Sequence, residues 1–278
     1  MSAAYGVFAQ YYDALTKNVC YAERAGKMDA LLKKWAAPDL PDNILLDLAC
    51  GTGSLSEEFA KLGWDVIGID GSEEMLSEAL DKKYDSGLPI QYLKQDMRSL
   101  DLYGSISAAV CALDSLNHLP KEEDVRRVFA RINLFSDAGA LFLFDVNTEY
   151  KHRHILADEC FVYELPDAVC VWQNHLEDTA PDYPVTIRLD FFEQTEGRHY
   201  IRSTEEFTEH IWQPELLEQM LAETGFTLLE VLDGDTYDVP TETTQRLLYI
   251  VRASGGQVGS GRQGRQPKSL PGSMSVQA

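Results

Sequence analysis

The sequence predicts an α/β fold: a doubly wound, mostly parallel, seven-stranded sheet with an antiparallel β lid inserted after the fifth strand. Short apolar runs alternate with amphipathic stretches from about residue 43 to residue 145, the pattern of parallel strands joined by helices. From about residue 151 to residue 212 the apolar period changes to two, which is typical of antiparallel strands. A helical stretch and two more apolar runs follow and complete the sheet.

The first half of the chain holds the parallel part of the sheet. Strands are expected at residues 44–48, 64–69, 90–93, 106–111 and 140–145. The helices between them are expected at residues 54–62, 72–83 and 121–134. Ser54 and Ser72 are the expected N-caps of the first two helices, because acidic residues follow each within one turn. Residues 7–15 and 21–35 are also helical in period and should lie over the mouth of the sheet or pack against its side.

The insertion is predicted to be an antiparallel meander of three or four strands. Large apolar residues occupy alternate positions of one run: Val185, Ile187, Leu189 and Phe191. A Thr-Glu-Gly-Arg turn at residues 195–198 follows this run. Aromatic residues make up about 17% of residues 161–212 against 10% of the whole chain. They can form a second small core or line a lid over a ligand, and the two interpretations are compatible.

After the insertion, a helix is expected at residues 213–224, with Pro214 at its start and Gly225 as its stop. The last two strands, residues 226–232 and 246–252, should close the sheet as an antiparallel pair. The predicted organisation is a core domain of residues 1–150 and 213–252, a substrate lid of residues 151–212 and a tail of residues 253–278.

The charge is strongly negative and unevenly distributed. The chain carries 24 Lys and Arg against 45 Asp and Glu, a formal net charge of -21. Residues 253–278 contain three basic residues and no acidic one, so the body before them carries -24. Such a body repels phosphate backbones and anionic lipids, and neither nucleic acid nor a membrane is expected as a partner. The Gly/Ser-rich tail should be disordered, and an extension foreign to the protein is equally compatible with it.

Cysteine usage and the N-terminal residues predict a cytoplasmic protein. The five cysteines form no C-x-x-C pair and are an odd number, so we expect reduced thiols. Neither a signal peptide nor a run of roughly 18 apolar residues is present in the sequence. The six histidines show no spacing typical of metal ligands, so no metal site is expected. Both a monomer and a homodimer stay open.

A glycine-rich turn follows the first predicted strand, where Asp-Leu-Ala-Cys-Gly-Thr-Gly occupies residues 47–53. Glycine lets a ligand approach the backbone closely and adopts positive φ at little cost. Asp70 ends the second predicted strand, 19 residues after Gly51, where a carboxylate can accept hydrogen bonds from ribose hydroxyls. The strand, turn, helix and strand-end acid together predict a site for a nucleoside cofactor.

Charge favours a cofactor without phosphates. Ser56 stands where dinucleotide sites usually have a third small residue, and Asp47 and Asp70 both face the expected site without compensating bases. These acids suit the cationic sulfonium and ammonium groups of S-adenosylmethionine, whose carboxylate suits the N-terminus of the following helix.

Four segments resemble the class I S-adenosylmethionine-dependent methyltransferases, including small-molecule and glycine N-methyltransferase-like members, over about residues 5–252. They are LDLACGTG at residues 46–53, GIDGSEEML at residues 68–76, QDMRSL at residues 95–100 and CALDSLNHL at residues 111–119. The resemblance implies a Rossmann-like fold, transferase activity and S-adenosyl-L-methionine as the cofactor.

The resemblance also assigns residues to the nucleoside half of that cofactor. Asp70 would bind the ribose, with Gly71 next to it, and Met75 would lie beside the adenine. Asp96 would accept a hydrogen bond from the adenine amino group, and Met97 would cover the ring.

The methionine half is expected near the first strand and the segment after the fourth. The residues implied there are Asp47, Ala49, Cys50, Gly51, Ala112 and His118. Tyr12, Tyr21 and Arg24 in the N-terminal helices are candidates for holding the cofactor carboxylate, with packing of amphipathic helices as the alternative.

The predicted reaction is an in-line displacement that carries the methyl group to a small molecule under the lid and leaves S-adenosylhomocysteine. His118 is the candidate catalytic base, with a capping or core role as the alternative. His152 and His154 are further candidates, although the run at residues 151–154 fits a solvated helix start better. No D-P-P-Y or N-P-P-Y stretch follows the fourth strand, which argues against a nucleic-acid substrate.

Two other function classes stay open. A non-catalytic S-adenosylmethionine-binding interaction or regulatory protein fits the motifs as well, because this chemistry has no universally required base. A nicotinamide-dependent reductase on a similar sheet is disfavoured, since no Tyr-x-x-x-Lys pair follows the sheet.

Overall fold

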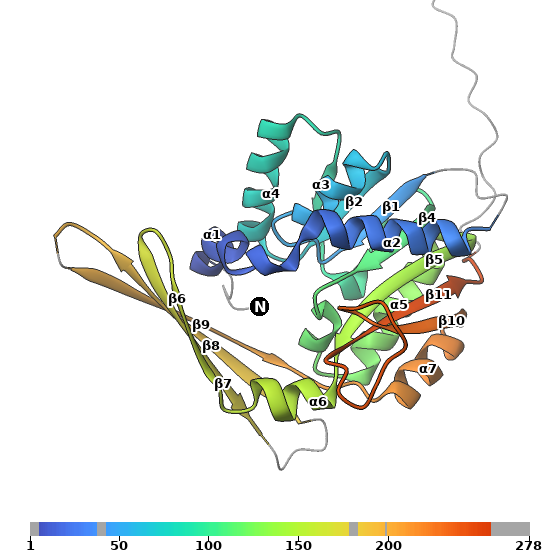
Figure 1. The fold of residues 1–278 in the computed structure, drawn as a ribbon. Coiled ribbons are helices and arrows are strands. Elements are labelled where there is room, and N and C mark those ends of the chain that lie inside the picture. Colours follow the sequence, from blue (N-terminus) through green and yellow to red (C-terminus); the bar gives the residue numbers. More distant parts are fainter. Residues whose placement is uncertain (1–5, 38–42, 178–182, 198, 257–278) are drawn as a thin grey trace, which may run out of the picture.

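The computed structural model describes residues 6–37, 43–177, 183–197 and 199–256. The expected tail lies outside the described residues from residue 257 onward. Figure 1 shows two parts: a seven-stranded sheet flanked by helices, and a four-stranded sheet that extends to one side of it.

The main sheet has the strand order β10-β11-β5-β4-β1-β2-β3, in which only β11 runs antiparallel to its neighbours. Its parallel strands are β1 (Ile44–Leu48), β2 (Asp65–Asp70), β3 (Gln91–Lys94), β4 (Ile106–Cys111), β5 (Ser136–Asn147) and β10 (Phe226–Asp233). β11 (Arg246–Ala253) lies between β5 and β10 and pairs with both. The predicted fold class and the antiparallel closing pair are confirmed. The strand order reverses between β1 and β4, which opens a crevice at the carboxyl ends of these strands.

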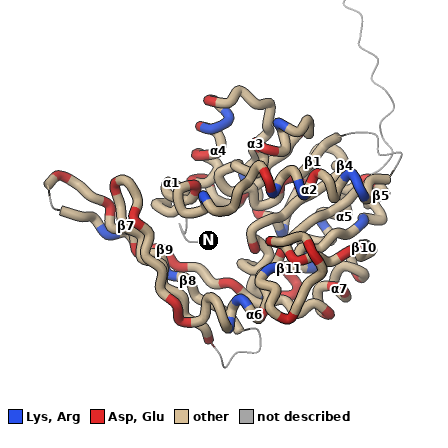
Figure 2. Tube along the Cα trace, viewed as in Figure 1, with Lys and Arg blue, Asp and Glu red and all other residues tan. Residues whose placement is uncertain are grey.

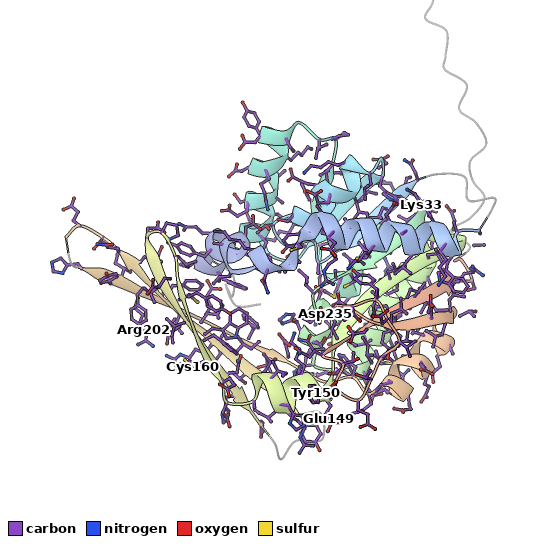
Figure 3. The ribbon with its side chains drawn as sticks, viewed as in Figure 1. Lys33, Glu149, Tyr150, Cys160, Arg202 and Asp235 are labelled. Atoms are coloured by element: carbon purple, nitrogen blue, oxygen red, sulfur yellow. The ribbon has the colours of Figure 1, made fainter. Side chains whose placement is uncertain are left out.

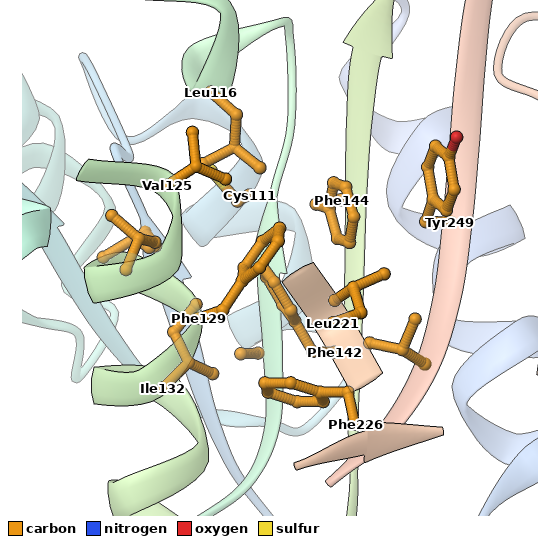
Figure 4. Close-up of a cluster of buried hydrophobic side chains, with 14 of the residues drawn as sticks. Cys111, Leu116, Val125, Phe129, Ile132, Phe142, Phe144, Leu221, Phe226 and Tyr249 are labelled. Carbon is orange, nitrogen blue, oxygen red and sulfur yellow. The ribbon is translucent and has the colours of Figure 1, made fainter. Parts of the chain in front are cut away.

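Helices cover both faces of this sheet. α2 (Tyr21–Trp35) and α3 (Ser54–Lys61) pack on one face, and α5 (Glu122–Phe135) and α7 (Pro214–Glu223) pack on the other. Figure 4 shows part of the second face, where Phe129 of α5 meets Phe144 of β5. The Phe144 ring also stacks on Tyr249 of β11 with the ring centroids 4.9 Å apart. These aromatic contacts pack α5 and β11 against β5, the strand whose carboxyl end leads to the inserted sheet.

The inserted sheet follows β5 in the chain and precedes α7. It contains β6 (Cys160–Glu164), β7 (Ala168–Leu176), β8 (Val185–Gln194) and β9 (Tyr200–Glu209), paired antiparallel in that order. The apolar residues at alternate positions of β8 are buried, as the period of two predicts. They pack against α1 (Gly6–Leu15), whose Phe8 stacks on Phe207 with the ring centroids 5.9 Å apart. Figure 3 shows Cys160 and Arg202 on the opposite side, directed away from α1.

Short elements connect these parts. α4 (Glu73–Ser86) follows β2, and α6 (Glu149–Lys151) leads with a π-helical turn, η4 (His152–Leu156), from β5 to the inserted sheet. The 3-10 turns are η1 (Lys17–Val19), η2 (Met97–Ser99) and η3 (Ser115–His118).

Two details of the expected elements are wrong. β5 begins at Ser136 and not at residue 140, because Gly139 with φ of 90° lets the strand run through a segment whose composition is typical of a turn. α3 is capped by Gly53 in the left-handed conformation, and Ser54 makes no N-cap bond. The Ser72 cap of α4 is confirmed, since its Oγ accepts a hydrogen bond from the Met75 N–H at 3.1 Å.

The distribution of charge and the lengths of the helices relate to the expectation that neither nucleic acid nor a membrane is a partner. Figure 2 shows acidic positions on the helices around the main sheet and on the inserted sheet. Among the described residues, no helix has the length and apolar character needed to cross a bilayer.

Candidate active site

The glycine-rich turn between β1 and α3 forms the floor of the site. Ala49, Gly51 and Gly53 have φ of 57°, 54° and 76°. A Cβ on Gly51 would meet no atom within 4 Å, whereas a Cβ on Gly53 would lie 2.8 Å from Tyr92 Cζ and closer still to its Oη. Gly51 therefore leaves room for a ligand, and Gly53 leaves room for the packing of Tyr92.

Asp70, the last residue of β2, connects this turn to the loop before α4. Its Oδ2 accepts a hydrogen bond from the Gly51 N–H and its Oδ1 accepts one from the Ser72 N–H, each at 2.8 Å. Burial raises the pKa of the Asp70 carboxyl, and these backbone bonds oppose the shift. Each carboxylate oxygen can accept a second hydrogen bond, which a pair of ribose hydroxyls can donate.

Asp47 lies below the turn and is 2% exposed. Its Oδ2 accepts a hydrogen bond from Ser56 Oγ at 2.5 Å. Burial raises the pKa of Asp47 to about 7, although the bond from Ser56 lowers it. Ser56 is thus the partner of a buried acid, and a glycine at this position would leave Asp47 without its hydrogen bond.

A cleft of about 1170 Å³ extends from this turn to the inner face of the inserted sheet. Gly51 of the turn and Asp70 of β2 line it, and so do Trp172, Ile187 and Phe207 of the inserted sheet. A recess of about 40 Å³ opens beside the turn. The cleft and the recess form one continuous site, because they share five lining residues: Tyr12, Ala49, Gly51, Leu113 and Ser115.

The predicted adenine contacts lie on the Asp70 side of the cleft. Gly71, Met75, Asp96 and Met97 all line it. Asp96 Oδ1 accepts a hydrogen bond from the Arg98 N–H at 2.9 Å. Bonds from the Arg98 guanidinium hold the pKa of Asp96 below its usual value, so this carboxyl is an acceptor at neutral pH.

Each Lys and Arg side chain along the cleft contacts another side chain of the protein. The cleft's four Lys and Arg residues each contact a nearby acid or amide: Lys94 contacts Glu73, Arg98 contacts Asp96, Arg246 contacts Asp114, and Lys151 contacts Asn147. The described lining therefore offers no unpaired cation for a pyrophosphate. With the space at Gly51 and the carboxylate of Asp70, this arrangement fits a nucleoside cofactor without phosphates.

The recess collects seven of the nine residues predicted for the methionine half, whereas His118 lines the larger cleft. The seven are Tyr12, Tyr21, Asp47, Ala49, Cys50, Gly51 and Ala112. Tyr21 Oη donates a hydrogen bond to Thr16 Oγ1 at 3.1 Å. Arg24 is not among the described lining residues, because its guanidinium donates to the Gly234 carbonyl at 3.3 Å and lies 3.6 Å from Asp145 Oδ2.

The loop after β4 is held in an unusual conformation. Leu113 and Asp114 have φ of 59° and 55°, and the buried Asp145 carboxylate accepts hydrogen bonds from both of their N–H groups at 3.0 and 2.7 Å. Asn117 connects the loop to two other elements, because it accepts from the Asn147 N–H at 2.9 Å and donates to the His210 carbonyl at 2.7 Å. This support fixes η3, which ends at His118.

Three ionisable side chains meet at the end of the cleft below the inserted sheet. Asp114, His118 and Glu209 each offer one ligand atom within 4.8 Å of the others. The His118 ring contacts Phe207 edge-on, with the ring centroids 5.2 Å apart. A search of sequence spacing does not find this group, because Glu209 comes from a strand far along the chain.

The histidines at residues 152 and 154 differ. His152 is fully buried, and its Nε2 lies 3.5 Å from Glu209 Oε2, so a solvated helix start is wrong for this residue. His154 is exposed and contacts Tyr150, as the solvated alternative predicts.

The polar residues that line the cleft and that sequence reasoning missed include Asn147, Lys151, Glu209 and Arg246. Three of them lie at strand termini, Asn147 and Glu209 as last residues and Arg246 as a first residue. The expected strand bounds place only Arg246 at a strand terminus, because the fifth strand is expected to end at residue 145 and no strand of the insertion is expected to end at Glu209.

This chain is similar to known proteins in sequence and in fold. The "Methyltransferase domain" family model matches residues 45–135. A putative methyltransferase of Geobacillus sp. (strain WCH70) is 31% identical over 248 residues, which cover 89% of this chain and 99% of that protein. The glycine/sarcosine N-methyltransferase of Halorhodospira halochloris is 31% identical over 137 residues, 48% of this chain and 51% of that protein.

A solved structure gives the same result. The S-adenosylmethionine-dependent methyltransferase from Clostridium acetobutylicum ATCC 824 aligns with a TM-score of 0.78 and 29% identity, covering 89% of this chain and 98% of that one. The chain belongs to the class I S-adenosylmethionine-dependent methyltransferases. The predicted enzyme class and cofactor are confirmed, in preference to the nicotinamide alternative.

Proposed function

We propose that this enzyme methylates a small molecule held in the cleft between the glycine turn and the inserted sheet. One observation carries the proposal: a single cleft joins Gly51 and Asp70 to the aromatic inner face formed by Trp172 and Phe207. Residues 151–212 act in this proposal as the substrate lid. The -24 charge of the body favours a neutral or cationic acceptor over nucleic acid or a membrane.

The nucleoside half of the cofactor binds along β2 and the loop after β3 in this proposal. Asp70 accepts from the ribose hydroxyls, with Gly71 next to it. Met75 and Met97 cover the adenine, and Asp96 accepts from its amino group. The support is that all five residues line this cleft.

The methionine half occupies the recess. Asp47, Ala49, Cys50, Gly51 and Ala112 border it, and Tyr12 and Tyr21 close it from the N-terminal helices. The position of Arg24, engaged with Asp145 and Asp235, favours a supporting role over direct binding of the carboxylate.

The cofactor supplies an electrophilic methyl group on a sulfonium, so the protein has to position the acceptor and exclude water. His118 is the proposed proton acceptor because it lines the cleft next to Phe207. The five free cysteines fit the proposed cytoplasmic location.

Calorimetric titration with S-adenosylhomocysteine and with NAD tests the cofactor site. Asp70→Ala should weaken S-adenosylhomocysteine binding by tenfold or more, since a charge-assisted hydrogen bond contributes about 1.5–3 kcal/mol. Asp65→Ala is the matched control, because Asp65 is exposed at the other end of the same strand. Equal affinity in the two variants would refute the role of Asp70.

Turnover is tested separately. Transfer of labelled methyl groups to a panel of small amines, phenols and acids should yield at least one labelled product. Labelling of nucleic acid with no labelled small molecule would contradict the proposed substrate class.

A further inference from the structure

Two carboxylates and an imidazole converge where the cleft ends below the inserted sheet. Asp114, His118 and Glu209 all line the cleft, with one ligand atom of each within 4.8 Å of the others. We call these three residues the acid–histidine cluster. One oxygen of each carboxylate already has a partner, since Asp114 Oδ1 accepts from Arg246 and Glu209 Oε2 accepts from Asn147, each at 2.7 Å. The other oxygens and the imidazole can accept hydrogen bonds from one small group.

Fixed cations lie next to this cluster. Arg246 Nη1 is 2.7 Å from both Asp114 Oδ1 and Asp145 Oδ1. Lys151 Nζ donates a hydrogen bond to Asn147 Oδ1 at 2.9 Å. Burial favours the neutral form of Asp114, but Arg246 and Lys151 outweigh it and hold the pKa of this carboxyl well below its usual value. Asp114 is therefore an anion at neutral pH.

The same cations disfavour a divalent metal ion. A metal bound to the cluster would compete with Arg246 for Asp114 and would add two positive charges beside Arg246 and Lys151. Asp145 shares Arg246 with Asp114, so three carboxylates, those of Asp114, Asp145 and Glu209, face the two cations Arg246 and Lys151. Arg24 and Asp235 lie next to them and offset each other, which leaves one negative charge in excess. A ligand with a charge of at most +1, which can also give up a proton, fits this balance.

An amine meets these requirements better than a hydroxyl. An ammonium ion has three N–H donors for the three acceptors, whereas a hydroxyl has one donor. An alkylammonium has a pKa of about 10.4 and an α-ammonium of about 8, whereas a hydroxyl as weakly acidic as water has a pKa of about 15.7. Any base in the site therefore removes a proton from an ammonium ion more easily than from a hydroxyl, by about 5 pKa units or more.

We propose that the acid–histidine cluster is the acceptor site, that the acceptor is a small-molecule amine bound as its ammonium ion, and that His118 removes its proton. This assignment rests on the proposed function and names its substrate class. Asp114 and Glu209 hold the ammonium, and Phe207 covers the side of the His118 ring.

The reaction in this site consists of a proton transfer to His118 and a methyl transfer to nitrogen. One N–H bond breaks, its electron pair stays on nitrogen, and the proton moves to a ring nitrogen of His118. The freed lone pair forms the N–C bond, while the electron pair of the breaking C–S bond stays on sulfur. The methylated ammonium later loses a proton to water, and so does His118.

A binding experiment tests the proposal without knowledge of the natural acceptor. The full chain is saturated with S-adenosylhomocysteine and titrated with two matched pairs: propylamine against propanol, and cyclohexylamine against cyclohexanol. The readout is the imidazole NMR signal of His118, identified by its loss in His118→Asn. The amines should shift this signal with a Kd at least tenfold lower than that of the matching alcohols.

A variant and its control locate the binding. Glu209→Gln should weaken cyclohexylamine at least tenfold, as expected for a lost charge-assisted hydrogen bond. Glu206→Gln should stay within twofold, because Glu206 is exposed three residues earlier on the same strand. If circular dichroism shows that Glu209→Gln does not fold, Asp114→Asn takes its place with the same expected loss.

The outcomes separate this inference from the proposed function. Three results would overturn the amine site while S-adenosylhomocysteine still binds. The first is equal binding of amines and alcohols, and the second is no response to amines. The third is a shift of the His118 signal caused by Mg²⁺ or Zn²⁺. A protein that fails to bind S-adenosylhomocysteine in the first place would overturn both.

Discussion

Alanine substitutions of Gly51 and Gly53 should have opposite effects on binding and on stability, although the two residues are neighbours in one turn. Both have positive φ, which costs an alanine about 1–2 kcal/mol. At Gly51 the new Cβ would enter open space. At Gly53 it would press on the Tyr92 ring, with Cζ at 2.8 Å and the Ala79 Cβ at 3.1 Å.

The magnitudes follow from these distances. Gly51→Ala should lower the free energy of unfolding of the ligand-free protein by about 1–2 kcal/mol, the backbone cost alone. Gly53→Ala adds an overpacking cost of about 1–3 kcal/mol, because a buried aromatic ring has to move. Tyr92→Phe in the Gly53→Ala background removes the nearest atom and should recover part of that second cost.

The ligand affects the two variants differently. Wild-type protein should gain about 2.7 kcal/mol from S-adenosylhomocysteine at one hundred times its Kd. Gly51→Ala should lose most of this gain, because its Cβ fills space in the cleft, whereas Gly53→Ala should keep most of it. Urea denaturation with and without the ligand measures both quantities. Equal destabilisation of the two variants, together with a full ligand gain in Gly51→Ala, would refute the reasoning.

Two further predictions follow from buried residues. Because burial raises the pKa of Asp47 from 3.8 to about 7, its favourable contribution is complete below pH 3.8 and is lost as the pH rises through 7. The free energy of unfolding should therefore fall between pH 4 and pH 8 by up to about 4 kcal/mol more in the wild type than in Asp47→Asn. Urea denaturation at each pH measures it, and curves of unfolding free energy against pH that run parallel for the two proteins would contradict this. Phe8→Ala, which removes a ring packed on Trp172 and Phe207, should cost about 3–5 kcal/mol and speed hydrogen exchange in α1 and the inserted sheet. Phe8→Leu should restore most of the protection, and faster exchange confined to α5 would show that the contact is unimportant.

Much of the fold follows from local sequence because its elements are strongly periodic. The expected bounds of α2 match the structure, and those of β2 and β3 differ by one residue. β5 is harder to predict because Gly139 and its neighbours are typical of a turn, and the pairing of Ser136 with Ile106 of β4 is what makes the segment part of a strand. The position of β11 between β5 and β10 is a tertiary result that composition does not encode.

The site divides in the same way. The nucleoside half could be predicted because β1, the turn and β2 are contiguous, so that Asp70 and Gly51 have a fixed spacing. The acceptor half could not, because Asp114, Glu209 and Arg246 come from three distant segments. Their meeting depends on the pairing of β11 with β5 and on Asn117, which bonds to Asn147 and His210.

α1 physically links the two halves of the site. At its C-terminal end, Asp13 accepts hydrogen bonds from Thr52 Oγ1 at 2.7 Å and Ser54 Oγ at 3.0 Å, in the glycine turn. At its N-terminal end, the Phe8 N–H donates to Glu205 of β9 at 2.9 Å. A helix of ten residues is marginal by itself, so α1 depends on both attachments. Tyr12 in its middle lines the cleft and the recess, and it is therefore held in place only when the turn and the inserted sheet are both in position.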